Sequence, residues 1–348
     1  MRNPNLIKYC FFSLVVLINI NISIAQSQTT SKIKGITYRG PELAPLHLFM
    51  FRNIAKSHAS WVSFVPAFVI DRQTLQLLPE TRKYRWYESQ IATMEGMTIA
   101  KQMGYKIFLK PHLRLLPKAA NEESKTIGSW RGTFAPKNNA DWEIWEAAYE
   151  KWMLDWAHMA DSLQVEMLCI GTELRLSAIK RTAFWRQLIP KIRAVYDGRL
   201  TYSANWDEYK QIRFWKELDY VGVNAYFPIH EARIPSVQEA VKAWKKHKKQ
   251  LKRNSKKIEL PILFTEFGYR NIQFAAKEPW QHEKVVATLN DEAQANLYQA
   301  FFKAFAQEKW VAGYFLWQWL GSEPSTSNTL FTPQGKPALK VLQKWYQQ

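Results

Sequence analysis

The stretch LPILFTEFGYRN, from Leu260 to Asn271, joins an apolar run to a glutamate, Glu266, which an aromatic residue, a glycine and a second aromatic residue follow. Short runs of apolar and β-branched residues are typical of buried strands. A carboxylate at the end of such a strand is costly to bury unless it has a partner or a chemical task. The stretch therefore predicts a strand that fixes the position of one functional acid.

Seven similar runs occur elsewhere in the chain, and longer amphipathic segments typical of helices separate them. In chain order, the eight predicted strands are Ile33–Tyr38, Trp61–Pro66, Lys106–Lys110, Val165–Gly171, Leu200–Ala204, Tyr220–Ala225, Ile262–Thr265 and Ala312–Trp317. The predicted helices are Leu46–Ser57, Tyr87–Met103, Trp142–Leu163, Ala178–Tyr196, Tyr209–Lys216, Ser236–Lys252, Asp291–Gln307 and Pro337–Tyr346, the sixth with a capping box of Ser236 and Glu239.

Eight alternating strand and helix units predict an α/β fold of one class, the single-domain (β/α)₈ or TIM barrel. A doubly wound open sheet would show fewer strands and a glycine-rich turn after the first strand, and no such turn occurs. No repeat or Pro/Gly/Ser-rich linker divides the chain. The longest connection, Pro111 to Asp141, follows the third strand, and connections of that length in compact domains are usually functional.

The first residues have the features of a secretory signal peptide. Arg2 and Lys8 precede an apolar run from about Tyr9 to Ile24, and Ser23-Ile24-Ala25 fits a cleavage site between small residues. We predict a signal peptide over residues 1–25, the barrel domain over residues 26–348, and a secreted or periplasmic protein with no membrane span after cleavage. The alternative is an uncleaved membrane anchor, although Asn19 and Asn21 interrupt this short run.

Composition narrows the classes of partner and cofactor. The net charge of +18, or +16 without Arg2 and Lys8, suggests an anionic neighbourhood such as acidic glycan or cell envelope. Much of it lies in the lysine-rich segment 242–257, which also fits a solvated helix face. Export and the absence of any nucleic-acid-binding signature argue against nucleic acid. Cys169 alone would remain after cleavage, so we expect no disulfide, and no metal-binding spacing or cofactor motif occurs. We expect a monomer.

In a (β/α)₈ barrel the residues at the carboxyl ends of the strands surround one site. This projection collects two carboxylates, several polar side chains and a set of aromatic ones. They are Tyr38, Arg39, Lys110, His112, Glu173, Asn205, Trp206, Asn224, Tyr226, Glu266, Trp317 and Trp319, and Trp130 in the long connection joins them. Aromatic faces pack against pyranose rings and polar groups bind their hydroxyls, so the combination predicts a site for a polysaccharide or oligosaccharide.

The stretch MLCIGTELR, Met167 to Arg175, places Glu173 directly after the fourth strand, as ILFTEFGY places Glu266 at the end of the seventh. This pairing resembles the clan of retaining glycoside hydrolases on (β/α)₈ barrels. Within the clan, the motifs KGITYRG, SFVP, LKPH, CIGTEL, VGVNAY, FTEFGYR and FLWQW are most similar to glycoside hydrolase family 113, which contains endo-β-1,4-mannanases, over essentially the whole mature chain.

By that resemblance, Glu173 is the acid/base, Glu266 the nucleophile, Tyr226 the hydrogen-bond partner of the nucleophile and Trp317 the floor of the sugar site. The motif FLWQW also implies a cis peptide between Trp317 and Gln318. No cofactor is implied.

Other interpretations of these residues stay open at this point. Glu173 alone could stabilise the start of the next helix, and Glu266 could pair with Arg270. His112 fits a cavity wall as well as a sugar ligand, and Lys110 fits the partner of a carboxylate. Another β-glycan, acidic or containing amino sugars, or a catalytically inactive glycan-binding barrel are the rival functions.

The sequence departs from the clan at Thr172, where an asparagine commonly precedes the acid/base and contacts the 2-hydroxyl of the sugar. The departure argues against a generic cellulase or galactanase. It leaves that contact to another group, such as Asn205 or Asn224, and leaves the stereochemistry at C2 of the sugar open.

Overall fold

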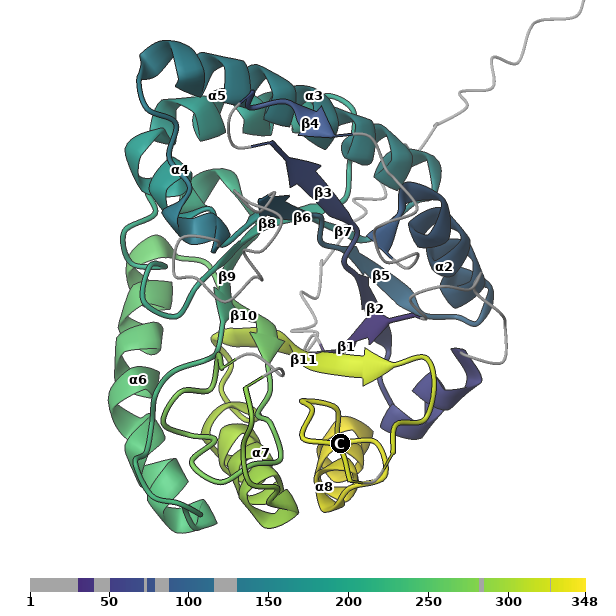
Figure 1. Cartoon of the computed structure of the whole chain (residues 1–348), viewed down its shortest axis with the longest axis vertical. Helices are drawn as coiled ribbons and strands as arrows, with labels where there is room; N and C mark the ends of the chain where they lie inside the picture. The colour runs from purple at the N-terminus through teal and green to yellow at the C-terminus, as the bar shows by residue number, and fades with distance from the viewer. Residues whose placement is uncertain are drawn as a thin grey trace, which may run out of the picture. The chain divides into compact units, whose positions relative to one another are not determined.

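A computed structural model describes residues 31–40, 51–71, 74–78, 88–115, 130–281, 285–325 and 327–348. Residues 32–348 form one compact unit, in which eight parallel strands close into a barrel surrounded by helices (Figure 1). The predicted TIM barrel and its eight strands are therefore confirmed. The predicted signal peptide, residues 1–25, lies outside the described residues.

The barrel strands are β1 (Ile33–Arg39), β2 (Trp61–Phe64), β5 (Lys106–Leu109), β7 (Met167–Thr172), β8 (Arg199–Ala204), β9 (Tyr220–Asn224), β10 (Ile262–Phe267) and β11 (Val311–Leu320). Around the barrel they run in the order β1-β11-β10-β9-β8-β7-β5-β2, and β2 pairs with β1. All neighbouring pairs are parallel, so the carboxyl ends of all eight strands lie at one end of the barrel.

Bulky side chains fill the inside of the barrel. Phe108 of β5 and Phe315 of β11 meet with ring centroids 4.7 Å apart, although their strands are not neighbours. Gly35 makes room for this contact, because a Cβ there would lie 2.2 Å from the Phe315 ring. Met167, Cys169 and other buried residues complete the cluster. The barrel interior is therefore a packed core, as this fold requires, and its mouth is where a site can form.

The helices cover the outside of the barrel. They are α2 (Gln90–Gln102), α3 (Asn139–Ser162), α4 (Arg175–Lys180), α5 (Thr182–Arg193), α6 (Val237–Ile258), α7 (Asp291–Phe305) and α8 (Pro337–Gln347). Ser236 caps α6 with the predicted capping box: its Oγ accepts the backbone N–H of Glu239, and the Glu239 carboxylate accepts the N–H of Ser236. Within the described ranges, no helix combines the length and hydrophobicity needed to cross a bilayer.

Two helix predictions need correction. The segment predicted as one helix over Ala178–Tyr196 is α4 and α5, which meet at Arg181, where a bidentate ion pair with Glu146 of α3 accompanies a non-helical backbone. The segment Tyr209–Lys216 forms turns that lead into a short 3₁₀ helix, η5 (Trp215–Glu217). Eight residues are too few for a stable helix without strong packing on one face. Residues 46–50 of the predicted helix Leu46–Ser57 lie outside the described residues, and its end is the 3₁₀ helix η1 (Asn53–Ser57).

A small second sheet lies at the barrel mouth and was not predicted. It consists of β3 (Ala67–Ile70), β4 (Leu77–Leu78) and β6 (His112–Leu115), in the order β4-β3-β6. β3 and β6 continue the chain beyond β2 and β5 and pair in parallel, with Ala67 opposite His112. The sheet uses the first part of the long connection after the third barrel strand to hold His112 at the mouth.

Candidate active site

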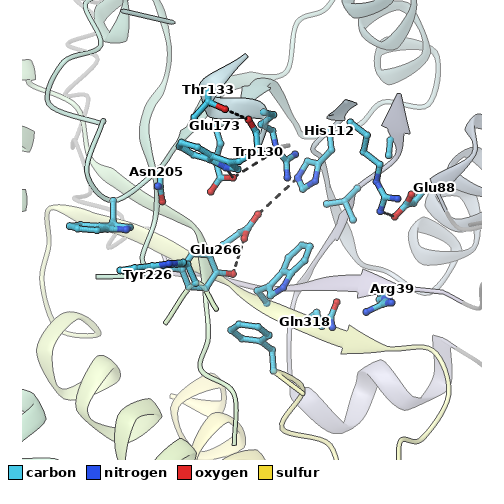
Figure 2. Close-up of a pocket in the computed structure, with 18 of the residues that line it drawn as sticks. Arg39, Glu88, His112, Trp130, Thr133, Glu173, Asn205, Tyr226, Glu266 and Gln318 are labelled. Carbon is cyan, nitrogen blue, oxygen red and sulfur yellow. Dashed lines mark hydrogen bonds and ion pairs between the residues drawn. The ribbon is translucent and has the colours of Figure 1, made fainter. Parts of the chain in front are cut away.

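A cavity of about 810 Å³ opens at the mouth of the barrel, where the strands end (Figure 2). Nine of the residues predicted for the site line it: Arg39, His112, Trp130, Glu173, Asn205, Trp206, Tyr226, Glu266 and Trp317. They come from segments spread over most of the described chain. Only the closure of the barrel brings them together, as the projection of strand ends predicted.

Glu173 enters the cavity directly after β7. Its backbone has φ 52°, in the left-handed region that is unfavourable for a residue with a Cβ, and its N–H donates to Ser203 O at 2.8 Å. Its carboxyl group accepts the Trp130 indole N–H at 3.2 Å and the Asn224 amide at 3.0 Å. Arg131 Nε lies 3.8 Å from the carboxyl group. An unfavourable backbone held in place by such contacts is typical of functional positions.

Glu266 enters the same cavity from β10, and its side chain is almost fully buried. Tyr226 Oη donates to Glu266 Oε2 at 2.8 Å, and the Lys110 ammonium group contacts Oε1. Burial and then the charge of Glu266 raise the pKa of Tyr226 well above its ordinary value, so the phenol keeps the proton that it donates. The cationic partner of Glu266 is therefore Lys110. Arg270 instead binds backbone carbonyl groups, among them Thr329 O at 2.9 Å.

His112 lies beside both Glu266 and Trp317. Its ring is nearly parallel to the Trp317 ring, with centroids 6.3 Å apart, and its Nε2 is 4.0 Å from Glu266 Oε1. Burial lowers the pKa of His112 well below its ordinary value, and nearby cations, Arg131 foremost, act in the same direction. The ring is therefore neutral and not an ion-pair partner of Glu266. Its buried Nε2 makes no hydrogen bond within the described residues, which leaves it for a bound molecule.

Four predicted residues do not line the cavity. Lys110 and Asn224 are fully buried beneath it and act on the two glutamates. Successive side chains on a strand face opposite ways, so Tyr38 lies on the outer face of β1 together with Ile36. Its ring stacks on Phe51, with the ring centroids 4.6 Å apart.

Trp319 is the fourth of these residues, and it is fully buried in the outer core. Between the pairs Ile36–Leu316 and Tyr38–Trp319, a bulge places two residues of β11 against one residue of β1. This one-residue shift turns Trp319 away from the face that Trp317 occupies. The peptide between Trp317 and Gln318 is cis, as predicted, and both residues line the cavity.

Sequence reasoning missed several residues of the cavity wall. Glu88 and Arg114 form an ion pair there, and Arg131, Asp207, Trp280 and Phe331 also line it. Arg131 directly follows Trp130, which was predicted for the site, so the sequence could have indicated Arg131 as well. Trp280 and Phe331 lie well beyond the ends of β10 and β11, and nothing local in the sequence marks them.

Two carboxyl groups with different partners share this cavity, and Figure 2 shows both pointing into it. Glu266 has a fixed cation and a phenol that stabilise its charge, whereas Glu173 contacts neutral donors and one more distant guanidinium group. The two carboxyl groups therefore lie in unlike surroundings within one cavity. Among the described residues, no group of His, Cys, Asp or Glu side chains is arranged to hold a metal ion.

Solved structures similar to this chain support the same architecture. The GH113 β-mannanase AaManA from Alicyclobacillus acidocaldarius, in complex with ManMIm, is 24% identical, with a TM-score of 0.75 over 91% of this chain and 97% of that one. A complex of a GH113 β-1,4-mannanase is 23% identical, with a TM-score of 0.75 over 91% and 99%. A β-glucuronidase from Ruminococcus gnavus is 12% identical, with a TM-score of 0.60 over 91% of this chain and 50% of that one.

At these identities the structural likeness shows the fold. Comparison with curated proteins gives no match. A family model described as Glycoside Hydrolase Family 113 matches residues 49–336, which is most of the chain. The protein therefore belongs to glycoside hydrolase family 113.

Proposed function

We propose that the protein cleaves a β-linked glycan with retention of configuration and that β-1,4-mannan is its substrate. Glu266 is the nucleophile and Glu173 the acid/base. The observation that carries the proposal is the environment of Glu266, a buried carboxylate held by Lys110 and Tyr226 in the cavity that Glu173 also lines. The mannan assignment rests on the family and on the solved structures that the chain resembles, which are those of GH113 β-mannanases.

In the first step, Glu266 attacks the anomeric carbon, the glycosidic bond breaks, and Glu173 gives its proton to the leaving oxygen. Lys110 and Tyr226 hold the carboxylate so that it approaches from a fixed direction. Asn224 and Trp130 donate to the Glu173 carboxyl group and stabilise the charge it acquires when the proton leaves. Retention requires the two carboxyl groups to lie about 5–5.5 Å apart around the bound sugar.

In the second step, Glu173 takes a proton from water, the water oxygen attacks the anomeric carbon, and the ester to Glu266 breaks. While the ester exists, Glu266 carries no charge, so Glu173 is then the anionic carboxyl group of the pair. The neutral His112 ring beside Glu266 has a free Nε2 for a sugar hydroxyl. Asn205 lines the cavity and Asn224 does not. Of these two asparagines, Asn205 is therefore the one that can contact the 2-hydroxyl of the sugar.

The test is release of reducing sugar from a panel of purified β-glycans that includes β-1,4-mannan, β-1,4-glucan, a glucuronic-acid-containing glycan and chitosan. We expect cleavage of mannan by the wild type and none by Glu266→Ala. Glu95→Ala, which removes an exposed carboxyl group on α2, is the matched control and should keep full activity. Preferred cleavage of another glycan would contradict the mannan assignment, and cleavage of none would favour a glycan-binding barrel.

We also propose that residues 1–25 direct export and are then removed. The charged start, the short apolar run and the small residues at 23–25 support this. Expression of the full chain in a bacterial host, fractionation and amino-terminal sequencing test it. A mature protein outside the cytoplasm that begins near residue 26 is expected, and an uncleaved chain in the membrane fraction would contradict it.

A further inference from the structure

Two tryptophans from distant segments stack on each other at one side of the cavity. Trp206 follows β8 and Trp280 follows β10, yet their rings are 5.6 Å apart and within 15° of parallel. Both line the cavity, and Trp280 is 46% exposed. A large indole held with one face in solvent forgoes the stabilisation that burial would give it. Such a face at a cavity wall is a binding surface for an apolar or amphipathic ligand.

The pair rests on a rigid base. Trp206 packs on Phe227, with centroids 5.8 Å apart, and Phe227 packs in turn on the fully buried Trp244 of α6 at 5.5 Å. This chain of ring contacts joins the exposed surface of Trp280 to the core of the barrel. A preformed surface loses little conformational entropy when a ligand binds, which favours its use as a binding site.

The order of the strands decides on which side of the carboxylates the pair lies. Between β7, which Glu173 directly follows, and β10, which carries Glu266, the barrel has β8 and β9 on one side. On the other side it has β11, β1, β2 and β5. Trp206 belongs to the first side. Figure 2 shows its neighbour Asn205 on the opposite side of the two carboxylates from Arg39 and Glu88.

The side chains placed to hold a sugar over Glu266 lie on the second side. Trp317 of β11 lines the cavity there, Lys110 Nζ lies 5.5 Å from its ring, and His112 Nε2 points at Glu266 from 4.0 Å. These groups surround the nucleophile and form a floor and a wall for one pyranose. A glycan that passes between the carboxylates therefore leaves its departing part on the side of Trp206 and Trp280.

We infer that Trp206 and Trp280 form a subsite for the leaving part of the glycan, where a neutral pyranose stacks on the exposed indole face. Pyranose rings present C–H groups on their faces and hydroxyls at their edges. The indole face packs against the C–H groups. Asp207, which also lines this side, can accept hydrogen bonds from the hydroxyls. This inference rests on the proposed function, and it gives the chain an extended site on both sides of the cleaved bond.

The experiment compares two substrates that share the same glycone. One is an oligosaccharide of the glycan that the wild type cleaves, long enough to leave two sugars. The other is the β-glycosyl fluoride of that glycone, which has no leaving sugar. Trp280→Ala should lower kcat/KM for the oligosaccharide about tenfold, as truncation of a buried aromatic contact does. It should change kcat/KM for the fluoride less than about twofold.

Phe274→Ala is the matched control, because Phe274 is 48% exposed in the same segment and is not among the residues that line the cavity. It should change neither value. Trp280→Phe, which keeps a smaller ring, should retain more activity on the oligosaccharide than Trp280→Ala.

An equal loss on both substrates with Trp280→Ala would place the pair on the glycone side, and no loss on either would show that it binds no sugar. Both results overturn the inference while the wild type remains active. An inert wild type would instead contradict the proposed function and this inference with it.

Discussion

Asn224 supports Glu173, the proposed acid/base, from below and has no surface in the cavity. It is fully buried, and its Oδ1 accepts hydrogen bonds from Ser203 Oγ at 2.8 Å and Thr265 Oγ1 at 2.9 Å. Two hydroxyl donors on the oxygen fix which way the amide points, so Nδ2 faces Glu173 Oε1 at 3.0 Å. A hydrogen bond to a carboxyl group that becomes charged is stronger than one between neutral groups. Asn224 is therefore a positioning residue for Glu173.

Asn224→Ala should lower kcat on a natural oligosaccharide about 10- to 100-fold, the value of one hydrogen bond to a charged group. Its effect should be much smaller on an aryl glycoside with a good leaving group, because that bond breaks with little help from an acid. Steady-state kinetics over a series of leaving groups measure the difference. A loss that is independent of the leaving group would mean that Asn224 only maintains the fold.

Glu208 is a second buried carboxyl group near Glu173. Burial is the main cause that raises its pKa to about 8, and the charge of Glu173 adds to it, while the Asn205 N–H opposes it. The folded state therefore binds a proton that the unfolded chain releases near the ordinary value of 4.5. The contribution of this proton to the free energy of unfolding is fully present below the pKa that Glu208 has in the unfolded chain. It is lost as the pH rises towards 8.

Glu208→Gln cannot ionise, so the free energy of unfolding of the variant relative to the wild type should rise between pH 5 and pH 8 by on the order of a few kcal/mol. Glutamine keeps an oxygen to accept the Tyr202 hydroxyl, which lies 3.5 Å from Glu208 Oε1. Urea unfolding at several pH values, with the exposed Glu95→Gln as control, measures this. A difference that does not change with pH would show that Glu208 is ionised in the fold.

At this scale the sequence was a good guide to Glu173 and Glu266 and a weaker one to their partners. Both glutamates follow strand runs directly, and the barrel fixes where strand ends point. Lys110 and Asn224 also stand at strand ends, but their side chains turn into the layer beneath the cavity. Whether a polar side chain faces the cavity or a buried neighbour depends on contacts between strands, which a single sequence does not display.

The long helix α3 begins soon after Trp130 and Arg131, the two residues of the preceding connection that lie against Glu173. Asn138 caps it: its Oδ1 accepts the backbone N–H of Asp141 at 2.9 Å. The cap satisfies one of the free N–H groups at the helix start and fixes where the connection ends.

Asn138→Ala should lower the free energy of unfolding by about 1 kcal/mol, the usual value of an amide cap. Asn139→Ala is the matched control, since Asn139 is equally exposed, lies inside the first turn and makes no cap. Thermal and urea unfolding of the two variants give the comparison. Equal stability of both would show that the Asn138 side chain does not cap α3.

Element boundaries were predictable where periodicity is strong and local. The strands, α3 and α6 with its capping box follow from such patterns. The break at Arg181 depends on an ion pair with α3, and the bulge in β11 depends on its pairing with β1. In the sheet of β3, β4 and β6, the short strand β3 pairs with β6, which lies far from it in the sequence. These features arise from tertiary contacts, so local sequence propensity does not predict them.

The number of strand runs determined the fold at the scale of the whole molecule. Eight buried parallel strands with covering helices can close on themselves, and closure leaves no exposed edge. The high positive charge is carried in part by α6, which buries Ala240, Trp244 and Leu251 and exposes most of its lysines. That arrangement fits the solvated helix face that we weighed against an anionic partner.

We propose that Glu173 and Glu266 carry out a double displacement in different roles. In Glu173→Ala, an activated aryl β-glycoside should still form the ester with Glu266, but water then lacks its base. Azide needs no base, so it should restore turnover and release a glycosyl azide. In Glu266→Ala no ester can form, and azide can attack only from the face opposite the leaving group.

The configuration of the azide product, read by nuclear magnetic resonance, distinguishes the roles of the two glutamates. We expect the β-glycosyl azide from Glu173→Ala, and from Glu266→Ala either no product or the α-glycosyl azide. An α-glycosyl azide from Glu173→Ala would instead mean that the two carboxylates hold the opposite roles.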